Sequence, residues 1–550
     1  MSQFFQSLSQ LINLNHLTLF FVNQKLDIDA ILSLSQSIQS MRNLESFSLG
    51  STKSTIHSSE YEQLFSTACS LSNMKNICLI LNNYCRQEGE FLKIFKHFEQ
   101  LKCIENFRFQ INDNSNNDLV SIFYNEQQKT IKTYIKDIKL DENLIQSLPL
   151  VIKNMSNLEA FNFNCEDSNA SMKELRQLSI SLGSITNLQK LDFEINKNNF
   201  AQEEYFSLFN YLGQSKSLNN LIFQFNHIDC DKNQASIVYD QQKNKIVLDL
   251  SGFQINKNDI QSLSSFIKSL DDLQIIEVNF NTCKISSNKL ISLFSFFRDH
   301  KSINHLSFGY YKQKITSEQL YALVQPLKQS KSLKKLEIQL SKTMLEKQAN
   351  EILSQQLSQL ESIQSLKYRV LQDDIDISSS FIDEIVKNTH LQDLDITFFH
   401  LEQLFYQINT QKLLGMPNLK NLTLQFYIRN NYARETQFFE NMDNIKQTNL
   451  QKLTIALHSF YDRDQKVDFY EQLGKFLSSQ RVIQNLEIQI MSNISIESCT
   501  SLIKELKNTY LKTFQFIFKD WNYFLYKEEL EKLKIYSLRK LQRAVKLEFQ

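Results

Sequence analysis

The sequence predicts an α/β repeat protein in which short parallel strands alternate with helices. A pattern of about a dozen residues recurs along the chain, as in QSKSLNNLIFQF from Gln214, QSKSLKKLEIQL from Gln329 and DHKSINHLSFGY from Asp299. Apolar residues within each copy alternate with a period of two, and the segments between copies have the period of a helix. These observations indicate one long array of repeats rather than several unrelated domains.

Apolar residues at the first, fourth, sixth and eighth positions define the pattern, which is often followed by Asn. Eighteen copies match it, mostly at intervals of 28 to 31 residues, and a degenerate nineteenth copy lies around Val545 and Leu547. The copies begin at Leu14, Leu44, Met74, Ile104, Ile135, Leu158, Leu188, Leu218, Lys245, Leu273, Ile303, Leu333, Ile363, Leu391, Leu419, Leu450, Ile483 and Leu511. In several later copies the Asn is replaced, so we expect a less regular C-terminal half. The replacing residues are Ser341, Phe399, Tyr427 and His458.

Each copy predicts a strand with one buried face, followed by an amphipathic helix. In LQKLDFEIN, the inward residues Leu191, Phe193 and Ile195 alternate with Asp192 and Glu194. In the segment after each strand, the apolar residues fall on one face of the expected helix. Examples are Leu290, Leu293, Phe294 and Phe297, and one copy later Leu320, Leu323, Val324 and Leu327. A unit of about 29 residues cannot bury its own apolar face, so the units must stack.

These copies resemble leucine-rich repeats of the long, ribonuclease-inhibitor-like type, and the resemblance covers nearly the whole chain. It implies an α/β leucine-rich-repeat solenoid, a horseshoe with a parallel concave sheet and outer helices. We expect residues 1–526 to form the array and residues 527–550 to form a C-terminal cap with a charged amphipathic helix, because terminal repeats need a polar outer face. The bases of this segment could instead bind an acidic partner. They are Lys534, Arg539, Lys540, Arg543 and Lys546.

A longer period is superimposed on the copies. SIFYNEQQK at Ser121 and SIVYDQQKN at Ser236 lie 115 residues apart, as do the two QSKS stretches, so four repeats form a duplicated block. The repeats that hold Y-x-Q-Q-K have a weak helical pattern. A plain duplicated block explains these repeats, and the alternative is that they carry an extended segment on the convex side.

Composition excludes several classes of protein. Sixty basic and sixty acidic residues balance, which argues against a general nucleic-acid or membrane-surface binder. The N-terminus has no basic region before its apolar residues, and no segment reaches the uninterrupted apolar length of a membrane span. Eight dispersed cysteines without a C-x-x-C pair indicate reduced thiols, so we expect a cytoplasmic or nuclear protein.

The chain contains no catalytic or phosphate-binding motif, so we expect no enzyme activity, no cofactor and no small-molecule substrate. The segment DNSNND (113–118) lacks the central Gly of a calcium loop, and Tyr124 stands where its last ligand would be. A cluster of potential ligands in another turn is explained more simply by turn chemistry than by a metal. It comprises His227, Asp229, Cys230 and Asp231.

Function should then lie on the outward strand positions, the fifth and seventh of each copy. The acids there are Asp141, Asp192, Glu194, Asp249, Glu277, Glu337, Asp395 and Glu487, and the bases are Arg108, Lys139, Lys367 and Arg369. From Leu188 to Leu340 these positions hold acids and no base. We hypothesise a concave acidic stripe that receives a basic segment of a protein partner. The alternative is a solvated strand face with a chance bias of sign.

The predicted function is therefore a non-catalytic scaffold for protein–protein interaction within a larger assembly. The alternative is a regulator of an enzyme, either a GTPase activator or a ubiquitin-ligase substrate receptor, since related repeat proteins do such work. An activator would need an Arg on a strand-to-helix loop, for which Arg108 is a candidate by position. Nucleic-acid binding would need the basic C-terminal stretch.

Overall fold

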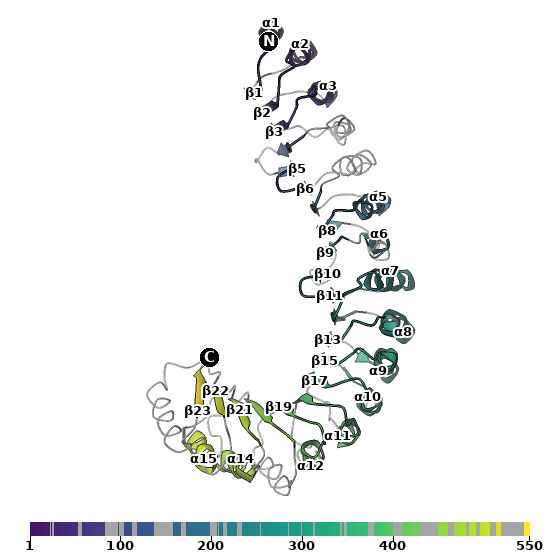
Figure 1. Ribbon diagram of the computed structural model, residues 1–550, viewed down its shortest axis with the longest axis vertical. Coiled ribbons are helices and arrows are strands. Elements are labelled where there is room, and N and C mark those ends of the chain that lie inside the picture. The colour runs from purple at the N-terminus through teal and green to yellow at the C-terminus, as the bar shows by residue number, and fades with distance from the viewer. Residues whose placement is uncertain are drawn as a thin grey trace. The chain divides into compact units, whose positions relative to one another are not determined.

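A computed structural model describes the chain outside a set of short gaps. The gaps are residues 23, 25–26, 53–57, 83–96, 98–103, 113–117, 137–157, 167–171, 199–205, 207, 213–216, 228–233, 254, 284, 299, 312–313, 342–343, 346–348, 372–378, 400–409, 429–448, 460–466, 480–482, 491–495, 507–512, 519–543 and 550. The chain divides into two compact units, Met1–Leu273 (unit 1) and Gln274–Gln550 (unit 2). Each unit is a stack of strands and helices of the kind expected for a repeat solenoid (Figure 1).

Unit 1 is built on a ladder of hydrogen-bonded strands. They are β1 (His16–Val22), β2 (Ser46–Thr52), β3 (Asn76–Asn82), β4 (Asn106–Asn112), β5 (Asp118–Asn125), β6 (Thr130–Lys136), β7 (Ala160–Glu166), β8 (Lys190–Asn198), β9 (Asn220–His227), β10 (Gln234–Asp240) and β11 (Lys245–Asp249). The pairs from β1 to β4 and from β6 to β9 are parallel. β5 is antiparallel to β4 and β6, and β10 is antiparallel to β9 and β11.

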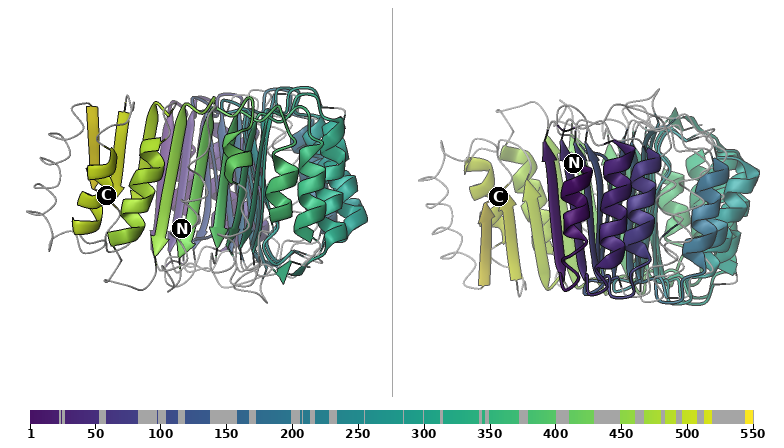
Figure 2. Two further views of the ribbon diagram at one scale, coloured as in Figure 1. Left: turned by 90° about the horizontal axis from the view of Figure 1, so that it is seen from below. Right: turned by 90° about the horizontal axis from the view of Figure 1, so that it is seen from above.

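Helices of unit 1 cover one face of this ladder (Figures 1 and 2). They are α1 (Ser2–Leu8), α2 (Ile28–Ser40), α3 (Ser58–Cys69), α5 (Met172–Gly183), α6 (Phe209–Leu212) and α7 (Lys257–Lys268). Side chains satisfy the free N–H groups where two of them begin. Asp27 accepts a hydrogen bond from the amide of Ala30, and Asn256 and Asp259 form a reciprocal capping box.

Unit 2 contains a ladder in which every described pairing is parallel. Its strands are β12 (Ile275–Asn279), β13 (His305–Tyr311), β15 (Lys335–Ser341), β17 (Ser365–Leu371), β18 (Asp393–Phe399), β19 (Asn421–Ile428), β20 (Lys452–Ser459), β21 (Asn485–Ile490), β22 (Thr513–Phe518) and β23 (Ala544–Phe549). A separate short parallel pair joins β14 (Lys314–Ile315) to β16 (Met344–Leu345).

The helices of unit 2 also lie on one side of its strands (Figure 1). They are α8 (Ser287–Phe294), α9 (Ser317–Val324), α10 (Ala349–Ser358), α11 (Ser379–Ile385), α12 (Thr410–Leu414), α14 (Val467–Ser479) and α15 (Ile496–Leu506), with the 3₁₀ turns η3 (Ser295–Arg298) and η4 (Gln325–Gln329). The apolar face predicted for the helix after Thr316 is confirmed, because Leu320, Leu323, Val324 and Leu327 are fully buried.

The core lies between strands and helices, and the predicted alternation of inward and outward residues is confirmed. In β9, Leu221, Phe223 and Phe225 are buried, whereas Ile222 and Gln224 are partly exposed. Equivalent inward residues stack from strand to strand. The ring centroids of Phe163 and Phe193 lie 4.8 Å apart and those of Phe193 and Phe223 lie 5.0 Å apart, with nearly parallel planes. Stacking of identical positions makes neighbouring repeats depend on one another.

The copy expected at Ile135 is displaced. The strand predicted after Ile135 falls mainly in residues 137–157, which lie outside the described residues, and the chain instead forms β6 shortly before them. In β6 the buried residues are Ile131, Thr133 and Ile135, and Thr130 pairs with Ala160. The sequence pattern favoured a different alternation of inward and outward residues, the one that begins at Ile135. The observed alternation also gives β6 a regular parallel pairing with β7.

The duplicated Y-x-Q-Q-K segments belong to the sheet, so the alternative that they form an extended segment on the convex side is wrong. Each segment forms the first strand and turn of an antiparallel hairpin, β5–β6 or β10–β11. Lys129 and Asn244 close the two turns with positive φ angles of 49° and 48°. The hairpins place β4 parallel to β6 and β9 parallel to β11, so the repeat direction is preserved.

The expectation of a less regular C-terminal half is also wrong for the described strands. Ser341 and Phe399, which replace the usual Asn, are the last residues of β15 and β18 and pair with Leu371 and Tyr427 on the next strands. Replacement of the Asn therefore does not interrupt the strand pairing at these two positions. The helix proposed within residues 527–550 and Trp521 lie outside the described residues, whereas β23 supplies the strand of the nineteenth copy.

No helix in the described part of the chain has both the length and the hydrophobicity that crossing a membrane requires.

Candidate functional site

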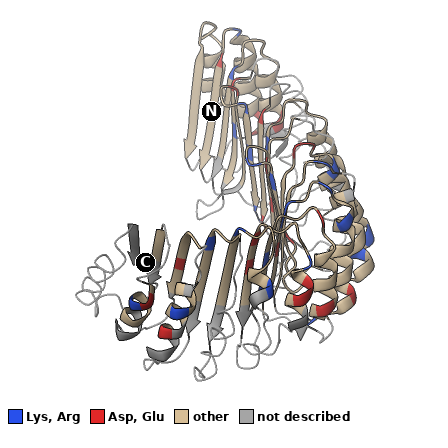
Figure 3. Ribbon diagram, turned by 60° about the horizontal axis from the view of Figure 1, so that its bottom comes forward, with Lys and Arg blue, Asp and Glu red and all other residues tan. Residues whose placement is uncertain are grey.

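The sheet surface opposite the helices, called the strand face here, consists of the outward side chains of the strands. In both units these side chains come from the third, fifth and seventh positions of the copies, and Figure 3 shows the charged residues along the ribbon. Register pairing brings equivalent positions of neighbouring copies side by side, at an interstrand spacing of about 4.8 Å. Residues about one repeat apart in the sequence can therefore form one site.

In unit 1 the structure brings Asp192 and Glu194 together on the outward side of β8. Amides of the preceding strand hold both carboxylates. Asn162 Nδ2 lies 2.9 Å from Asp192 Oδ2, and Asn164 Nδ2 lies 2.7 Å from Glu194 Oε2. Asn196 Nδ2 donates to Glu194 Oε1 at 2.7 Å. Neutral donors therefore orient the two acids without neutralising their charge.

The two carboxylates repel each other. Partial burial raises the pKa of Asp192 above its usual value, the charge of Glu194 raises it further, and Lys190 opposes the shift. A raised carboxylate pKa means that the folded protein disfavours the ionised form. At neutral pH the pair therefore lies in a setting that would gain from an incoming cation.

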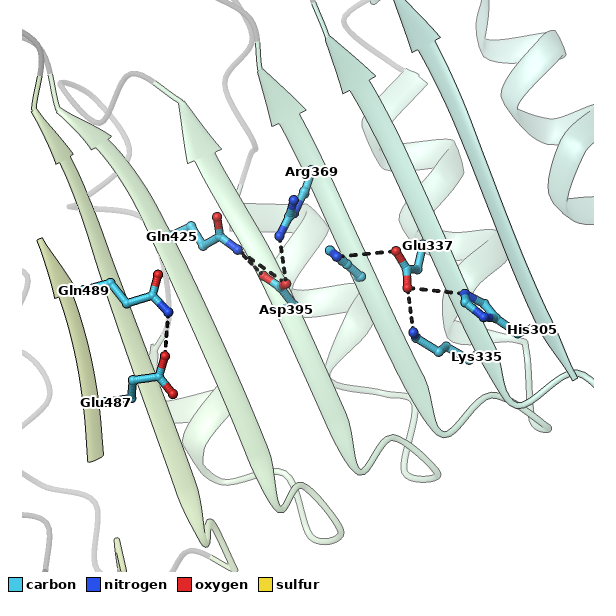
Figure 4. Close-up of polar contacts among 9 residues, drawn as sticks. His305, Lys335, Glu337, Arg369, Asp395, Gln425, Glu487 and Gln489 are labelled. Carbon is cyan, nitrogen blue, oxygen red and sulfur yellow. Dashed lines mark hydrogen bonds and ion pairs between the residues drawn. The ribbon is translucent and has the colours of Figure 1, made fainter. Parts of the chain in front are cut away.

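In unit 2 Glu337 forms the centre of an ion-pair network across three strands (Figure 4). Lys335 Nζ lies 2.6 Å and His305 Nε2 lies 3.2 Å from Glu337 Oε1, and Lys367 Nζ lies 3.4 Å from Oε2. The close contact with His305 and the neighbouring lysines hold the pKa of Glu337 well below its usual range, although partial burial opposes them. Glu337 is thus compensated within the chain.

Asp395 and Glu487 also have partners on the strand face of unit 2 (Figure 4). Arg369 Nη2 lies 3.6 Å from Asp395 Oδ2, and Gln425 Nε2 donates to Asp395 Oδ1 at 3.0 Å. Burial nevertheless raises the pKa of Asp395, outweighing Arg369 and Lys367. Lys452 Nζ lies 2.8 Å from Glu487 Oε2.

The other predicted acids do not extend the Asp192–Glu194 pair into a continuous stripe. Asp249 accepts hydrogen bonds from the amide and the hydroxyl of Ser251, so it caps the turn after β11. Glu277 lies half-buried on β12, where it pairs in register with Ser307. Asp141 and Lys139 lie outside the described residues.

Sequence reasoning found Lys367 but missed His305 and Lys335 beside Glu337, because it read the fifth and seventh positions alone. His305 and Lys335 occupy third positions, one on the preceding strand and one on the same strand. Reading the third position of each copy together with the other two would have revealed them.

Arg108 lies in the middle of β4 and not on a strand-to-helix loop, where the activator hypothesis needed it. Its guanidinium Cζ lies 5.1 Å from the ring centroid of Phe123 on β5. Gln110 Oε1 accepts hydrogen bonds from Arg108 Nε at 3.1 Å and from Nη2 at 2.5 Å.

Among the described residues, no group of three or more His, Cys, Asp or Glu side chains is arranged to hold a metal ion. Cys69, Cys165 and Cys283 are buried free cysteines, and burial raises the pKa of the Cys283 thiol to about 12. A thiol with such a pKa is a poor nucleophile at neutral pH.

Comparisons with known proteins place few constraints on function. No family model matches the sequence, and no curated protein matches it. Among solved structures, the C-terminal domain of tropomodulin from Caenorhabditis elegans is similar at 21% sequence identity, over 28% of this chain and 91% of that chain, with a TM-score of 0.22. A similarity at this level is too low to indicate a function for this chain.

Proposed function

We propose that the protein is a non-catalytic scaffold of the long leucine-rich-repeat, ribonuclease-inhibitor-like type that binds a protein partner in a larger assembly. The binding surface is the strand face of unit 1, and a basic segment of the partner contacts Asp192 and Glu194. The protein works in the cytoplasm or the nucleus, where its thiols stay reduced.

The charge state of Asp192 and Glu194 supports this proposal most strongly. No described cation forms an ion pair with either carboxylate, and their hydrogen-bond partners are neutral amides. A lysine or arginine side chain between the two carboxylates would relieve their repulsion. The asparagines already hold the carboxylates in fixed positions in which they can bind such a side chain. Glu337 offers no such gain, because Lys335 and Lys367 already form ion pairs with it.

The amides on β7 give the site its rigidity. Asn162 and Asn164 lie on the neighbouring strand in register with Asp192 and Glu194, and all four are partly buried. Part of the entropy cost of ordering the site is therefore met in the free protein. This arrangement favours recognition of a defined segment over a diffuse attraction for positive charge.

The test begins with affinity capture from native cells and identification of the captured proteins by mass spectrometry, followed by binding of the purified partner. We expect Asp192→Lys with Glu194→Lys to weaken that binding by about tenfold or more, because attraction becomes repulsion. Asp192→Asn with Glu194→Gln removes the charge but keeps hydrogen-bond acceptors, and it should give a smaller loss. Binding of the wild type should weaken as salt rises.

Glu361→Lys is the control, because Glu361 is exposed in a loop of unit 2 away from the strand face. Unchanged binding of the partner by the Asp192→Lys, Glu194→Lys variant would contradict the proposed site. An intrinsic hydrolase or transferase activity of the purified chain, lost on mutation of a defined site, would contradict the non-catalytic function.

A further inference from the structure

The hairpin β5–β6 and strand β4 display a second feature that the acidic site does not use. Arg108 on β4, Phe123 on β5 and Lys132 on β6 pair in register and form one row on the strand face. Arg108 and Lys132 are exposed, and Phe123 between them is partly exposed. The row is called the hairpin row here.

The cations of the hairpin row have no carboxylate partner among the described residues. Arg108 is held by the neutral Gln110 and by the ring of Phe123, which fixes the guanidinium without neutralising it. Its remaining N–H donors are available to an acceptor. Nearby acids are engaged elsewhere, since Glu166 Oε2 lies 3.5 Å from Lys136 Nζ and 3.4 Å from the hydroxyl of Tyr134.

The duplicated hairpin provides a comparison within the same unit. At the equivalent positions, β9, β10 and β11 carry Ile222, Val238 and Val247, which are in register with one another. The backbone arrangement is thus the same, whereas both charges and the aromatic ring are absent. The hairpin fold therefore does not require Arg108, Phe123 and Lys132 on its outward face.

We propose that the hairpin row binds an acidic protein segment in which two carboxylates flank an apolar side chain. Arg108 and Lys132 are separated by two interstrand spacings, about 10 Å between Cα atoms. Residues i, i+2 and i+4 of an extended peptide point to the same side, and the Cα atoms of i and i+4 lie about 13 Å apart, a difference that the long side chains of Arg108 and Lys132 can span. One carboxylate meets the Arg108 guanidinium, the other meets the Lys132 ammonium, and the apolar side chain lies on Phe123.

Nearby charge favours an acidic peptide over a nucleic acid. Lys132 pairs in register with Asn162, and Asn162 pairs with Asp192, so the acidic site begins two strands beyond the hairpin row. A continuous polyanion laid across the strands would meet Asp192 and Glu194, whereas a short acidic motif ends before them. The formal net charge of zero also provides no long-range attraction for phosphates.

This inference rests on the proposed function and adds to it an oppositely charged contact. A partner segment with an acidic motif over β4–β6 and a basic residue over β8 would bind in one direction only. Reversing the segment would place like charges together at both ends. The strand face of unit 1 would thereby fix the orientation of its partner.

The test uses fluorescence anisotropy of a labelled peptide that contains Glu-Ser-Phe-Ser-Glu, with the full-length protein at low salt. We expect this peptide to bind more tightly than the same peptide with lysines in place of both glutamates. Arg108→Glu with Lys132→Glu should weaken binding of the acidic peptide about tenfold, a change of about 1.4 kcal/mol. Circular dichroism melting checks that the variant folds.

If the charge-reversed variant is unstable, a variant that is expected to gain binding tests the proposal instead. Ile222→Arg, Val238→Phe and Val247→Lys together install the hairpin row in the second hairpin, and we expect them to increase binding of the acidic peptide. Equal binding of the acidic peptide by the wild type and a folded Arg108→Glu, Lys132→Glu variant would overturn the proposal. Tighter binding of a single-stranded RNA, lost on the same reversal, would overturn it in favour of nucleic acid.

The two sites can fail separately. If a basic segment binds through Asp192 and Glu194 but the acidic peptide does not bind, the hairpin-row proposal is wrong and the proposed function stands. If the acidic peptide binds through Arg108 and Lys132 while reversal of Asp192 and Glu194 leaves partner binding unchanged, the acidic contact in the proposed function is wrong.

Discussion

The strand faces of units 1 and 2 are built from the same positions of the same repeat, yet their charges are arranged in opposite ways. In unit 2 Glu337, Asp395 and Glu487 have cations on their own or neighbouring strands. In unit 1 neutral amides hold Asp192 and Glu194, and Arg108 contacts a glutamine and an aromatic ring. The strand face of unit 1 also contains an ion pair, Lys136 with Glu166, but no described cation forms an ion pair with Asp192 or Glu194.

The pKa shifts of two carboxylates express this difference as free energy. The pKa of Glu337 is lowered, so its ionised form stabilises the folded state. The pKa of Asp192 is raised, so its ionised form costs stability. Burial also raises the pKa of Asp395 in unit 2, but Arg369 lies 3.6 Å from that carboxylate, whereas no described cation forms an ion pair with Asp192.

The backbones of the two units also differ. Unit 1 contains two antiparallel hairpins within its ladder, whereas the described ladder of unit 2 is parallel throughout. Each hairpin adds outward positions that a plain strand–helix repeat would not have. Phe123 on β5 is one of these positions, and it completes the row with Arg108 and Lys132.

Substitutions on the inward face of the strands should lower the free energy of unfolding most, and by a similar amount in the two units. Leu221 and its counterpart Leu336 are fully buried, so Leu221→Asp and Leu336→Asp should each cost more than the roughly 2 to 5 kcal/mol of a buried large-to-small change. Gln224→Asp and Gln339→Asp should change the midpoint of urea unfolding little. Equal midpoints for inward and outward variants would contradict the strand register.

A medium effect should follow from Glu337→Gln, which removes the negative charge that Lys335 and Lys367 face but keeps an acceptor oxygen. We expect a loss of about 1 kcal/mol in the free energy of unfolding near neutral pH. Because the folded pKa of Glu337 is depressed, its contribution is present above the ordinary carboxylate pKa and is lost as pH falls towards the folded value. Melting curves against pH should therefore converge for wild type and variant under acid conditions, and a constant difference would contradict this account.

The smallest effect should have the opposite sign. Asp192→Asn keeps an acceptor for Asn162 but removes the repulsion from Glu194, so we expect a gain of a few tenths of a kcal/mol at neutral pH. The folded pKa of Asp192 is raised, so the gain should shrink as pH falls through that value and the wild-type carboxyl becomes protonated. A clear loss of thermal stability at neutral pH would show that Asp192 is structural.

The repeat and its inward residues were predictable because they depend on local periodicity. The alternation of Leu191, Phe193 and Ile195 with Asp192 and Glu194 is visible in a single copy. The hairpins were not predicted, because TIKTYIK and the segment after Ile135 offer competing alternations and only pairing with β7 decides between them. The turn-forming role of Lys129 likewise depends on its backbone conformation.

The residues of the candidate site were predictable from the sequence. Whether neighbouring cations compensate their charges was not. Asp192 and Glu337 look alike in sequence, as outward acids at the same position of their copies. Their difference comes from cross-strand neighbours about thirty residues away, Asn162 for the first and Lys367 for the second, and from Lys335 on the same strand as Glu337. A row of acids read from one position per copy cannot reveal which of them is already compensated.

The most direct measurement places a photo-crosslinking aromatic residue at Gln224 in unit 1 and, separately, at Gln339 in unit 2. The two positions are counterparts in the duplicated block, and Gln224 pairs in register with Glu194. Irradiation in native cells, followed by mass spectrometry, should crosslink a protein partner from position 224 and not from position 339. Crosslinks from position 339 alone would contradict the assignment of binding to the strand face of unit 1.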